Sequence, residues 1–485
     1  MKSPHPKPGV TETFEAFNER FYSLFDDPAV FDCQEFNILK LAQDGLKVQY
    51  SGRSRLSWPV WAIRALHFLK RLVARLRGGV NPFEAVDTRI RTQGLATRPW
   101  LVFDDGTFTL DPAGSKVPVY SQRLFEVLGR DQVTYLKEVP PRNGEDLGYD
   151  VSLPMYLPHE FWLSVTPEDA ATFRALRNTV RRLRRETRFS AEACTWISIS
   201  CYHMWMVYRI VRHILQTSTA SACYLNCHYH KEGIILALRR KGIFVTELQH
   251  GLIAPMDIFY VYPPVITVVR DRALFADQLW VWGPYWEEVV RQGFEYPPSR
   301  LTICGYYNYE NPQPTADIEA LVSTRTAGGG QVILVATQTM LDAYFVDYVT
   351  WLSADLLARG NHSVILVKPH PAEGFTPYES LRACPNVILT LDPVSGLFKL
   401  ADVLVTIYST VLYEALRHHL PVYALWVESC AGYVSDILQT GAARRLELRQ
   451  NPLDLHTESS PAEPEHFFSP FQPEMFLHPI AAPVS

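Results

Sequence analysis

The sequence lacks both the long hydrophobic runs of membrane-spanning proteins and the dense cysteines of disulfide-held scaffolds. No stretch approaches the ~18 uncharged apolar residues of a transmembrane helix, and the first residues lack the apolar core of a signal peptide. The 8 cysteines among 485 residues are dilute and irregularly spaced, which predicts reduced thiols. We therefore expect a cytoplasmic protein without a membrane span.

The sequence also lacks an excess of basic residues. Lys and Arg number 46 against 51 Asp and Glu, giving a formal net charge of −5, which argues against nucleic acid as the main partner. Hydrophobic residues make up 47% of the chain, so disordered and collagen-like proteins are excluded as well. The length predicts about two to four domains.

Aromatic residues, in contrast, are abundant. The chain holds 25 Phe, 24 Tyr and 11 Trp, together with 35 Pro and only 25 Gly. Such a surplus fits large cores, carbohydrate contact or membrane contact, and composition does not choose among them. Tyr408 lies near a predicted cleft edge, where its ring could stack on a sugar or a base.

Residues 1–97 are poorly periodic and are predicted to form an N-terminal extension. Its notable segment, Ser51–Arg77, carries seven Arg or Lys and no acid among Trp and Leu side chains. This composition fits an amphipathic helix in peripheral contact with an anionic membrane. The alternative is an ordinary domain-packing helix with a basic outer face, and both interpretations stay open.

From Trp100 onward, short apolar runs alternate with helical patterns. This alternation occurs on both sides of a Pro- and Gly-rich stretch, and it predicts an α/β chain with two doubly wound parallel sheets. A helix is predicted after Thr166, which precedes a proline and two acids, and its many arginines indicate a solvated face. The expected divisions are a Rossmann-like domain at 98–307, a linker at 308–330, a second such domain at 331–450 and a loosely packed proline-rich tail at 451–485.

The motif Gln249-His250-Gly251 follows an apolar strand of the first predicted domain. Ligands of open α/β sheets bind beyond the carboxyl ends of the strands, so this motif is expected to line the cleft. Gly251 would let substrate approach the backbone, and His250 is a candidate general base. A structural role for His250 remains the alternative.

Two further polar motifs follow strands of the second predicted domain. Lys368 and His370 lie on a turn stiffened by two prolines, which suits a phosphate or nucleotide edge. Ser409 and Thr410 lie where a strand passes into a helix, with Glu414 one turn later. Hydroxyl groups and main-chain N–H groups at such a position favour an anion, and Glu414 could accept from ribose hydroxyls. A plain capping role is the alternative.

Metal binding has little support in the sequence. No Asp-x-Asp motif stands at a strand end, and the Cys/His group at 223–230 lacks a second cysteine pair. Strand alternation would also point Cys227 and His228 to opposite faces. We expect neither a metal nor a cofactor.

Taken together, the motifs resemble a family. The segments are ELQHGL at 247–252, QLWVWG at 278–283, KPHP at 368–371 and YSTVLYEAL at 408–416. They are similar to GT-B-fold transferases of bacterial surface and capsular polysaccharide biosynthesis, a group that includes CDP-glycerol glycerophosphotransferases and bacterial sialyl- and Kdo-transferases. The resemblance spans about 99–446 and implies a GT-B-like fold of two Rossmann-like domains facing across a cleft.

The resemblance also implies roles for individual residues. His370, Ser409 and Thr410 would hold the phosphates of the donor nucleotide, and His250 would match the histidine that acts as base in the glycerophosphotransferase branch. Here that motif reads Gln-His-Gly where those polymerases have Trp-His-Gly. The sialyltransferase branch uses an acidic motif instead, and Asp105 within Asp104-Asp105-Gly106 matches it.

The predicted function is that of a nucleotide-sugar-dependent glycosyltransferase. It would transfer a sugar or polyol phosphate from a CMP-, CDP- or UDP-activated donor to a surface-polysaccharide, glycan or lipid-linked acceptor. Two alternatives remain: a non-catalytic nucleotide- or carbohydrate-binding protein of a polysaccharide assembly complex, and a nucleotide-sugar epimerase on the same fold.

Overall fold

The computed structural model describes most of the 485-residue chain. The described residues are 19–50, 97–104, 106–111, 113–137, 149–152, 166–187, 189–255, 257, 259–293, 300–310, 313–371, 373–455 and 463–478. Ser51–Arg77, Asp105 and the end of the proline-rich tail lie outside these ranges. No helix among the described residues has the length and apolar character needed to cross a bilayer.

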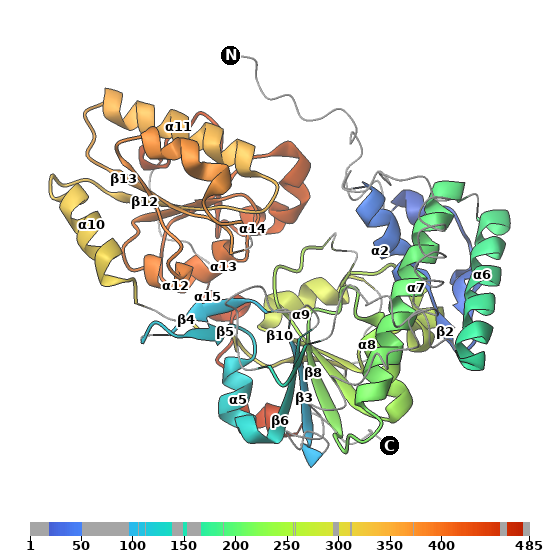
Figure 1. The fold of residues 1–485 in the computed structure, drawn as a ribbon. Helices are drawn as coiled ribbons and strands as arrows, with labels where there is room; N and C mark the ends of the chain where they lie inside the picture. The colour runs from blue at the N-terminus through green and yellow to red at the C-terminus, as the bar shows by residue number, and fades with distance from the viewer. Residues whose placement is uncertain are drawn as a thin grey trace, which may run out of the picture.

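The first domain is built on a seven-stranded parallel sheet (Figure 1). Its spatial order is β11-β10-β9-β8-β3-β6-β7. The strands are β3 (Trp100–Asp104), β6 (Val133–Lys137), β7 (Val151–Ser152), β8 (Ala222–Asn226), β9 (Phe244–Leu248), β10 (Gln278–Val281) and β11 (Leu301–Ile303). A short antiparallel pair, β4 (Phe108–Leu110) and β5 (Lys116–Pro118), follows the first of them.

The second domain is built on a six-stranded parallel sheet. Its spatial order is β14-β13-β12-β15-β16-β17. The strands are β12 (Val332–Ala336), β13 (Val364–Lys368), β14 (Val387–Leu389), β15 (Val403–Thr406), β16 (Val422–Leu425) and β17 (Arg444–Leu446). The central strands read Val-Ile-Leu-Val because helices cover both faces of a parallel sheet and every position is buried.

The two sheets share one topology. Within each domain, the first three strands in sequence run outward from the centre in one direction, and the later strands run outward in the other. The reversal falls between β3 and β8 in the first sheet and between β12 and β15 in the second. Ligands of doubly wound folds bind at such a reversal, so each domain presents one position of this kind. The predicted α/β, GT-B-like class of two doubly wound parallel sheets is confirmed.

The remaining described helices surround the sheets. Those of the first domain are α5 (Gln122–Leu128), α6 (Pro167–Glu186), α7 (Ala191–Ile214), α8 (Glu232–Lys241) and α9 (Pro284–Arg291). Those of the linker and second domain are α10 (Ala316–Thr326), α11 (Asp342–Ala358), α12 (Val394–Leu397), α13 (Val411–Leu416) and α14 (Ser435–Gln439). The predicted cap of α6 is confirmed: Thr166 and Asp169 form a reciprocal capping box, and Pro167 occupies the first helical turn between them.

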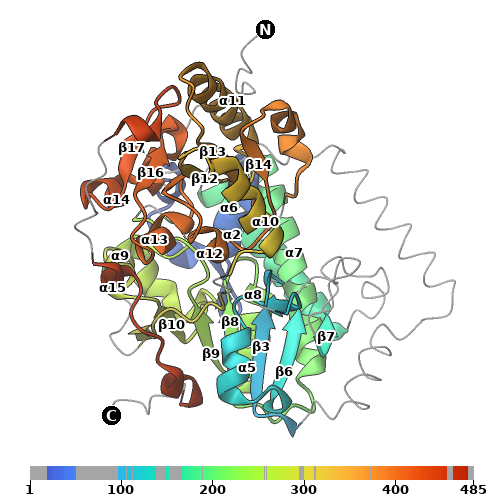
Figure 2. The same cartoon turned by 90° about the vertical axis from the view of Figure 1, so that its left-hand side faces the viewer.

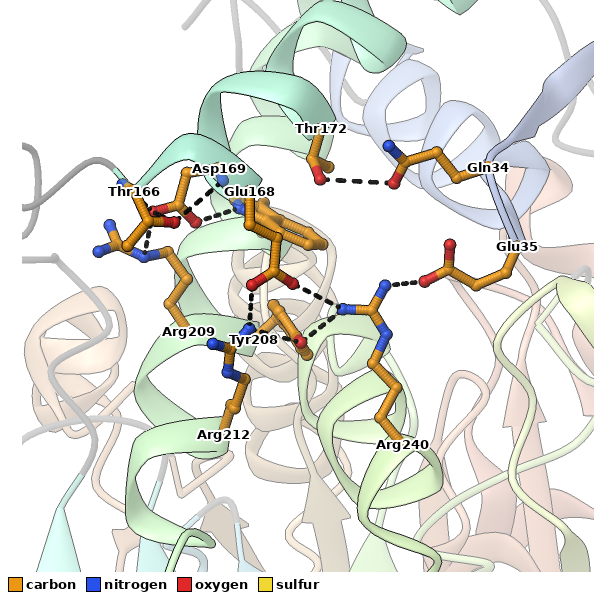
Figure 3. Close-up of polar contacts among 11 residues, drawn as sticks. Gln34, Glu35, Thr166, Glu168, Asp169, Thr172, Tyr208, Arg209, Arg212 and Arg240 are labelled. Carbon is orange, nitrogen blue, oxygen red and sulfur yellow. Dashed lines mark hydrogen bonds and ion pairs between the residues drawn. The ribbon is translucent and has the colours of Figure 1, made fainter.

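Part of the expected N-terminal extension is integral to the first domain. The hairpin of β1 (Asp32–Cys33) and β2 (Phe36–Asn37) and helix α2 (Leu39–Tyr50) pack on α6 and α7. Arg240 on α8 pairs with Glu35 in this hairpin and with Glu168 on α6, and Arg212 pairs with the same Glu168 at 2.6 Å (Figure 3). Chain segments distant in sequence therefore form one helical layer beside the first sheet (Figure 1).

The expected loosely packed tail is instead tightly packed where it is described. Helix α15 (Pro464–Phe467) and the residues after it run along α9 and β10 (Figure 2). Phe467 and Phe476 are fully buried, and Trp286 Nε1 donates to Phe467 O at 2.6 Å. A Cβ at Gly305, where φ is +78°, would lie 2.0 Å from Pro470 O, so only glycine admits the tail there. The chain thus returns to the first domain after completing the second, because aromatic side chains anchor it there.

Candidate active site

His250 lies at the carboxyl edge of the first sheet, two residues after β9. Its side chain is partly buried, and its carbonyl oxygen accepts a hydrogen bond from Tyr120 Oη at 2.9 Å. The ring of Tyr229, from the loop after β8, meets the imidazole edge-on at 5.3 Å between centroids. Beside it, a Cβ at Gly251 would touch no atom within 4 Å, so open space adjoins this turn. His250 is therefore held by its neighbours at an edge that has room for a ligand.

Gln249 supports this turn from the inside. It is fully buried, its Oε1 accepts from Trp282 N at 3.0 Å, and its Nε2 donates to Gly251 O at 3.0 Å. The side chain thereby ties the residue after β10 to the residues after β9. It positions His250 and Gly251 rather than lining a cleft itself.

Behind His250 lies a chain of buried polar groups. Tyr260 Oη lies 3.2 Å from His250 Nδ1 and donates to Glu247 Oε1 at 3.0 Å. The same Glu247 oxygen accepts from the main-chain nitrogen of His228 at 3.1 Å and lies 2.6 Å from its Nδ1. Glu247, His228 and Tyr260 are each at most 2% exposed, so bulk water does not screen these contacts.

The two titratable members of this chain differ in protonation. Burial lowers the pKa of His228, against the opposing effect of Glu247, so its imidazole is neutral at pH 7. Burial alone would raise the pKa of Glu247, but His228, Lys40 and the Tyr260 hydroxyl together hold that pKa below its ordinary value. Glu247 is consequently a carboxylate that accepts several hydrogen bonds, which is the usual condition for an acid buried in a strand.

The second base candidate, Asp105, lies outside the described residues. Its neighbour Asp104 ends β3 and is fully buried; one carboxylate oxygen accepts from Gly106 N at 2.6 Å and the other from Ser121 Oγ. Asp104 therefore closes a turn at the point where the first sheet reverses its strand order.

At the carboxyl edge of the second sheet, the predicted donor residue Lys368 ends β13 and His370 follows it. The main-chain nitrogen of His370 donates to Thr337 Oγ1 at 3.1 Å, which joins the ends of β13 and β12. Burial lowers the pKa of the His370 imidazole, and Lys368 adds to this effect while Glu373 opposes it. Lys368 is buried and its Nζ donates to Pro369 O at 2.8 Å; burial lowers its pKa to about 8. The ammonium is thus turned into its own loop.

The third motif lies across the strand reversal of the same sheet. Tyr408 N donates to Gln338 Oε1 at 2.7 Å, so the residues after β15 and β12 are joined. The ring of Tyr408 stacks on Tyr433 at 4.8 Å. Ser409 Oγ accepts from Val411 N at 3.3 Å, and Thr410 precedes the six-residue helix α13 without a side-chain cap. His370, Ser409 and Thr410 thus follow strands on either side of β12, at one edge.

Glu414 faces the linker between the domains. Its carboxyl group meets the hydroxyl groups of Thr410 and Tyr306, and burial, reinforced by Glu310, raises its pKa to about 7. Arg417, one turn further along, pairs with Glu310 at 3.0 Å and lies over the Tyr306 ring at 4.6 Å. Glu414 is therefore part of the contact between the second domain and the linker.

The segment after β11, immediately before the linker, contacts both sheet edges, so it connects the two groups of residues. Tyr307 Oη donates to Gln249 O at 2.7 Å, immediately before His250, while the adjacent Tyr306 lies against Glu414. Two consecutive tyrosines consequently contact the His250 turn and the helix that begins after Thr410.

The Cys/His group of the first domain forms no metal centre in the described chain. Among the described residues, no group of three or more His, Cys, Asp or Glu could hold a metal ion. His228 instead directs Nδ1 to Glu247, and Cys223 is fully buried in β8.

Sequence reasoning missed Glu247, Tyr260 and His228 as neighbours of His250. One signal was present: Glu247 is an acid inside an otherwise apolar strand, and a buried carboxylate needs partners. No comparable signal marks Tyr260, because its approach to His250 depends on the path of the loop after β9.

Comparison with solved structures finds distant likenesses. No protein-family model matches the chain, and no curated protein does. The glycotransferase of kitacinnamycin is 14% identical, with a TM-score of 0.42 over 73% of this chain and 88% of that one. The UDP-GlcNAc 2-epimerase from Neisseria meningitidis bound to UDP-GlcNAc is 9% identical, with a TM-score of 0.42 over 72% and 87%. The wall teichoic acid polymerase TagF is 13% identical, with a TM-score of 0.37 over 76% and 80%. Likenesses this distant transfer no activity to this chain.

Proposed function

We propose that the protein is a glycosyltransferase that uses a nucleotide-activated donor and needs no metal. It transfers a sugar or polyol phosphate to a surface-polysaccharide, glycan or lipid-linked acceptor. The observation that carries the proposal is that Tyr306 and Tyr307, just before the linker, join two different edges: one has a supported imidazole on the first sheet, and the other has a hydroxyl group beside an imidazole on the second.

The chemistry needs one group at each end of the reacting bond. His250 takes the proton from the acceptor hydroxyl as its oxygen bonds to the transferred group. The bond from that group to the nucleotide phosphate breaks, and the departing phosphate carries the negative charge. Ser409 and Thr410 donate hydrogen bonds to it and His370 lies beside it, so the charge is stabilised where it develops.

The other two residues proposed for the nucleotide-donor site, Lys368 and Glu414, act without touching the donor. Lys368 is turned to Pro369 O, so it contributes positive potential behind the turn rather than a direct contact. Glu414 positions the helix after Thr410 against Tyr306. Because α13 has only six residues, we base the donor site on the joined ends of β12, β13 and β15 and not on a helix dipole.

The first experiment is a binding panel. The purified chain is titrated with CMP-, CDP-, UDP- and GDP-activated donors, and binding and nucleotide release are measured. We expect one nucleotide class to bind, and we expect Ser409→Ala or His370→Ala to weaken its affinity about tenfold, the value of one or two hydrogen bonds to a charged group.

The matched control is His362→Ala. His362 is an exposed histidine of the same domain that precedes β13, at the opposite edge of the sheet. Its removal should leave donor affinity unchanged. Binding of no donor, or equal weakening by both histidine variants, contradicts the donor site. Binding without release favours a non-catalytic binding protein, and conversion of the donor sugar without transfer favours an epimerase.

Two finer assignments are part of the proposal. Asp105 is the alternative base, and Asp105→Asn rather than His250→Gln would then abolish transfer.

A cytoplasmic protein acting on a lipid-linked acceptor would also gain from peripheral membrane contact through the basic segment 51–77. Deletion of this segment should then lower partition into anionic liposomes.

A further inference from the structure

The polar chain behind His250 has one consistent direction. Glu247 is a carboxylate, which can only accept hydrogen bonds. The Tyr260 hydroxyl therefore donates its one proton to Glu247 Oε1, at 3.0 Å. The Tyr260 oxygen is then an acceptor toward His250 Nδ1, 3.2 Å away. A neutral imidazole has one N–H, and this arrangement places it on Nδ1.

We propose that Tyr260 and Glu247 are positioning residues that hold His250 in the Nδ1–H tautomer, which leaves Nε2 as the basic nitrogen. This inference rests on the proposed role of His250 as a base and names the groups that orient it. When Nε2 takes the acceptor proton, the imidazolium keeps its Nδ1–H bond to Tyr260, and the Glu247 carboxylate beyond stabilises the new positive charge.

The position of Glu247 is itself fixed. His228 contacts Glu247 Oε1, the oxygen that accepts from Tyr260, through both its main-chain nitrogen and Nδ1. The side chains of His228, Glu247 and Tyr260 are all buried. Nε2 of His228 is buried and finds no hydrogen-bond partner among the residues that the structure describes, so the described polar contacts of this imidazole are to the carboxylate. Burying the polar groups of Glu247, His228 and Tyr260 costs free energy. A histidine at position 250 with a purely structural role does not require this arrangement.

The test reads the tautomer directly and needs no substrate. Histidine labelled with ¹⁵N is incorporated into the full chain, and the His250 resonances are identified by their absence in His250→Gln. We expect the ¹⁵N shifts of wild-type His250 to show a protonated Nδ1. In Tyr260→Phe they should move toward the Nε2–H form, which predominates for free histidine.

The matched control is Tyr224→Phe. Tyr224 is a buried tyrosine of the same sheet that also loses one hydrogen bond, to Phe476 O at 2.6 Å, but lies outside the polar chain. It should leave the His250 tautomer unchanged. A wild-type His250 protonated at Nε2, or a tautomer that ignores Tyr260→Phe, overturns the proposal even if some variant fails to fold.

The transfer reaction separates this proposal from the proposed function. With an active donor, Tyr260→Phe should lower kcat by about tenfold or more and leave the donor KM within about twofold, because an orienting group acts on the proton transfer. If no donor is turned over while the tautomer behaves as expected, the proposed function fails and the positioning of His250 stands.

A second observation concerns the outer face of α6. Five arginines recur at intervals of three or four residues and therefore share one exposed face. This arginine stripe consists of Arg174, Arg177, Arg181, Arg184 and Arg185. Across the described residues, none of the five has a hydrogen bond or ion pair, whereas the inner Arg209, Arg212 and Arg240 each meet an acid (Figure 3).

This contrast shows how charge is divided within the helical layer. Glu35, Glu168 and Asp169 all pair with the inner arginines, and no acid among the described residues forms an ion pair with the stripe. Like charges three and four residues apart repel, so the stripe is unfavourable to the folded chain by itself. The whole chain is acidic, with a net charge of −5, so the stripe is a local concentration of positive charge.

We propose that the arginine stripe docks on an anionic phospholipid surface. The face is convex and carries a row of guanidinium groups, so it can lie against a plane of lipid phosphates. A convex face does not enclose a flexible acidic polymer as a groove would. The acid-free segment 51–77, with its tryptophans, follows directly after α2, which packs on α7 in the same layer.

The experiment compares two triple variants with equal charge change. Arg177→Gln, Arg181→Gln and Arg184→Gln remove three stripe charges, while Arg291→Gln, Arg382→Gln and Arg449→Gln remove three acid-paired arginines elsewhere. Binding to phosphatidylglycerol vesicles is measured by co-sedimentation. The stripe triple should lose about 100-fold in partition, and the control triple much less.

Equal loss in the two triples overturns the proposal, as does equal binding of the wild type to phosphatidylcholine vesicles. If heparin binds with the same dependence on the stripe and the vesicles do not, the partner is an acidic polymer and the lipid assignment is wrong. If deletion of 51–77 abolishes vesicle binding while the stripe triple has no effect, that segment and not the stripe makes the contact.

Discussion

At the carboxyl edge of the first sheet, the polar side chains are titratable and linked to one another, whereas at the same edge of the second sheet they are mostly neutral groups that accept hydrogen bonds from main-chain nitrogens. His250, Tyr260 and Glu247 form a continuous buried chain. Thr337, Gln338 and Ser409 make separate contacts with main-chain nitrogens. Since both sheets have the same strand order, topology places the two sites but side chains decide what each can do.

The comparison indicates a division of labour. In the proposed reaction, the proton moves at the edge where a carboxylate lies behind an imidazole, and the donor phosphate binds at the edge where hydroxyl groups lie near an imidazole of lowered pKa.

The largest effect is expected at the first edge. His250→Gln should lower the rate of transfer by about 10²–10⁴-fold, the usual contribution of a general base, and leave donor affinity within about twofold. Isothermal titration and a nucleotide-release assay measure the two quantities. An equal loss of donor affinity would falsify the division between the edges.

Glu414 tests the second domain through the pH dependence of stability. Its pKa in the folded chain is raised to about 7 from 4.5, so the folded state binds the proton more tightly than the unfolded state. The stabilising contribution is complete below about pH 4.5 and is lost as pH rises to about 7, a change of up to about 3 kcal/mol.

Glu414→Gln should therefore be more stable than the wild type at pH 8 and should flatten the dependence between pH 5 and pH 8. Denaturant unfolding at the two pH values gives the measurement. Glu379→Gln, at an exposed carboxylate paired with Arg382, is the control and should reproduce the wild-type curve. The same slope in wild type and Glu414→Gln would contradict the assignment.

Gln249 and Gln338 each join the ends of two strands in their sheet, and replacing them should cost different amounts of folding stability. Gln249 is fully buried and uses both ends of its amide, whereas Gln338 uses Oε1 to hold Tyr408 N. Gln249→Leu leaves two main-chain groups unpaired and should cost about 2–4 kcal/mol, against about 1–2 kcal/mol for Gln338→Leu. Equilibrium unfolding of both variants checks the order, and the reverse order would show that the first turn has another support.

The smallest effect is expected at the contact between the domains. Arg417→Ala removes an ion pair to Glu310 whose two side chains are partly exposed, at 33% and 19%, so stability should fall by only up to about 1 kcal/mol. Differential scanning calorimetry measures the change. A larger loss would mean that the packing of Arg417 on Tyr306 and Phe468 matters more than its charge.

Several parts of this organisation follow from short-range patterns. The strand at 332–336, the capping box at Thr166 and helix α8 could all be predicted, because apolar periodicity and cap residues act over a few positions. The strand ends carrying His250, His370 and Ser409 followed from the same patterns. The tail was predicted wrongly, since its proline content indicates weak local structure and says nothing of the aromatic surface that receives Phe467 and Phe476.

The two doubly wound sheets and the polar residues after their strands follow from the sequence alone, because both depend on local periodicity and on the edge at which parallel strands end. The folded chain was needed to show that Tyr260 and Glu247 lie behind His250, that Gln249 is internal, and that Tyr306 and Tyr307 join the two edges. These contacts connect residues from different strands and loops, and they form because buried polar groups must find partners wherever the packed chain brings them. The scarcity of hydrophobic runs and cysteines thus excluded whole classes of protein, while the chemistry of the site was settled by packing.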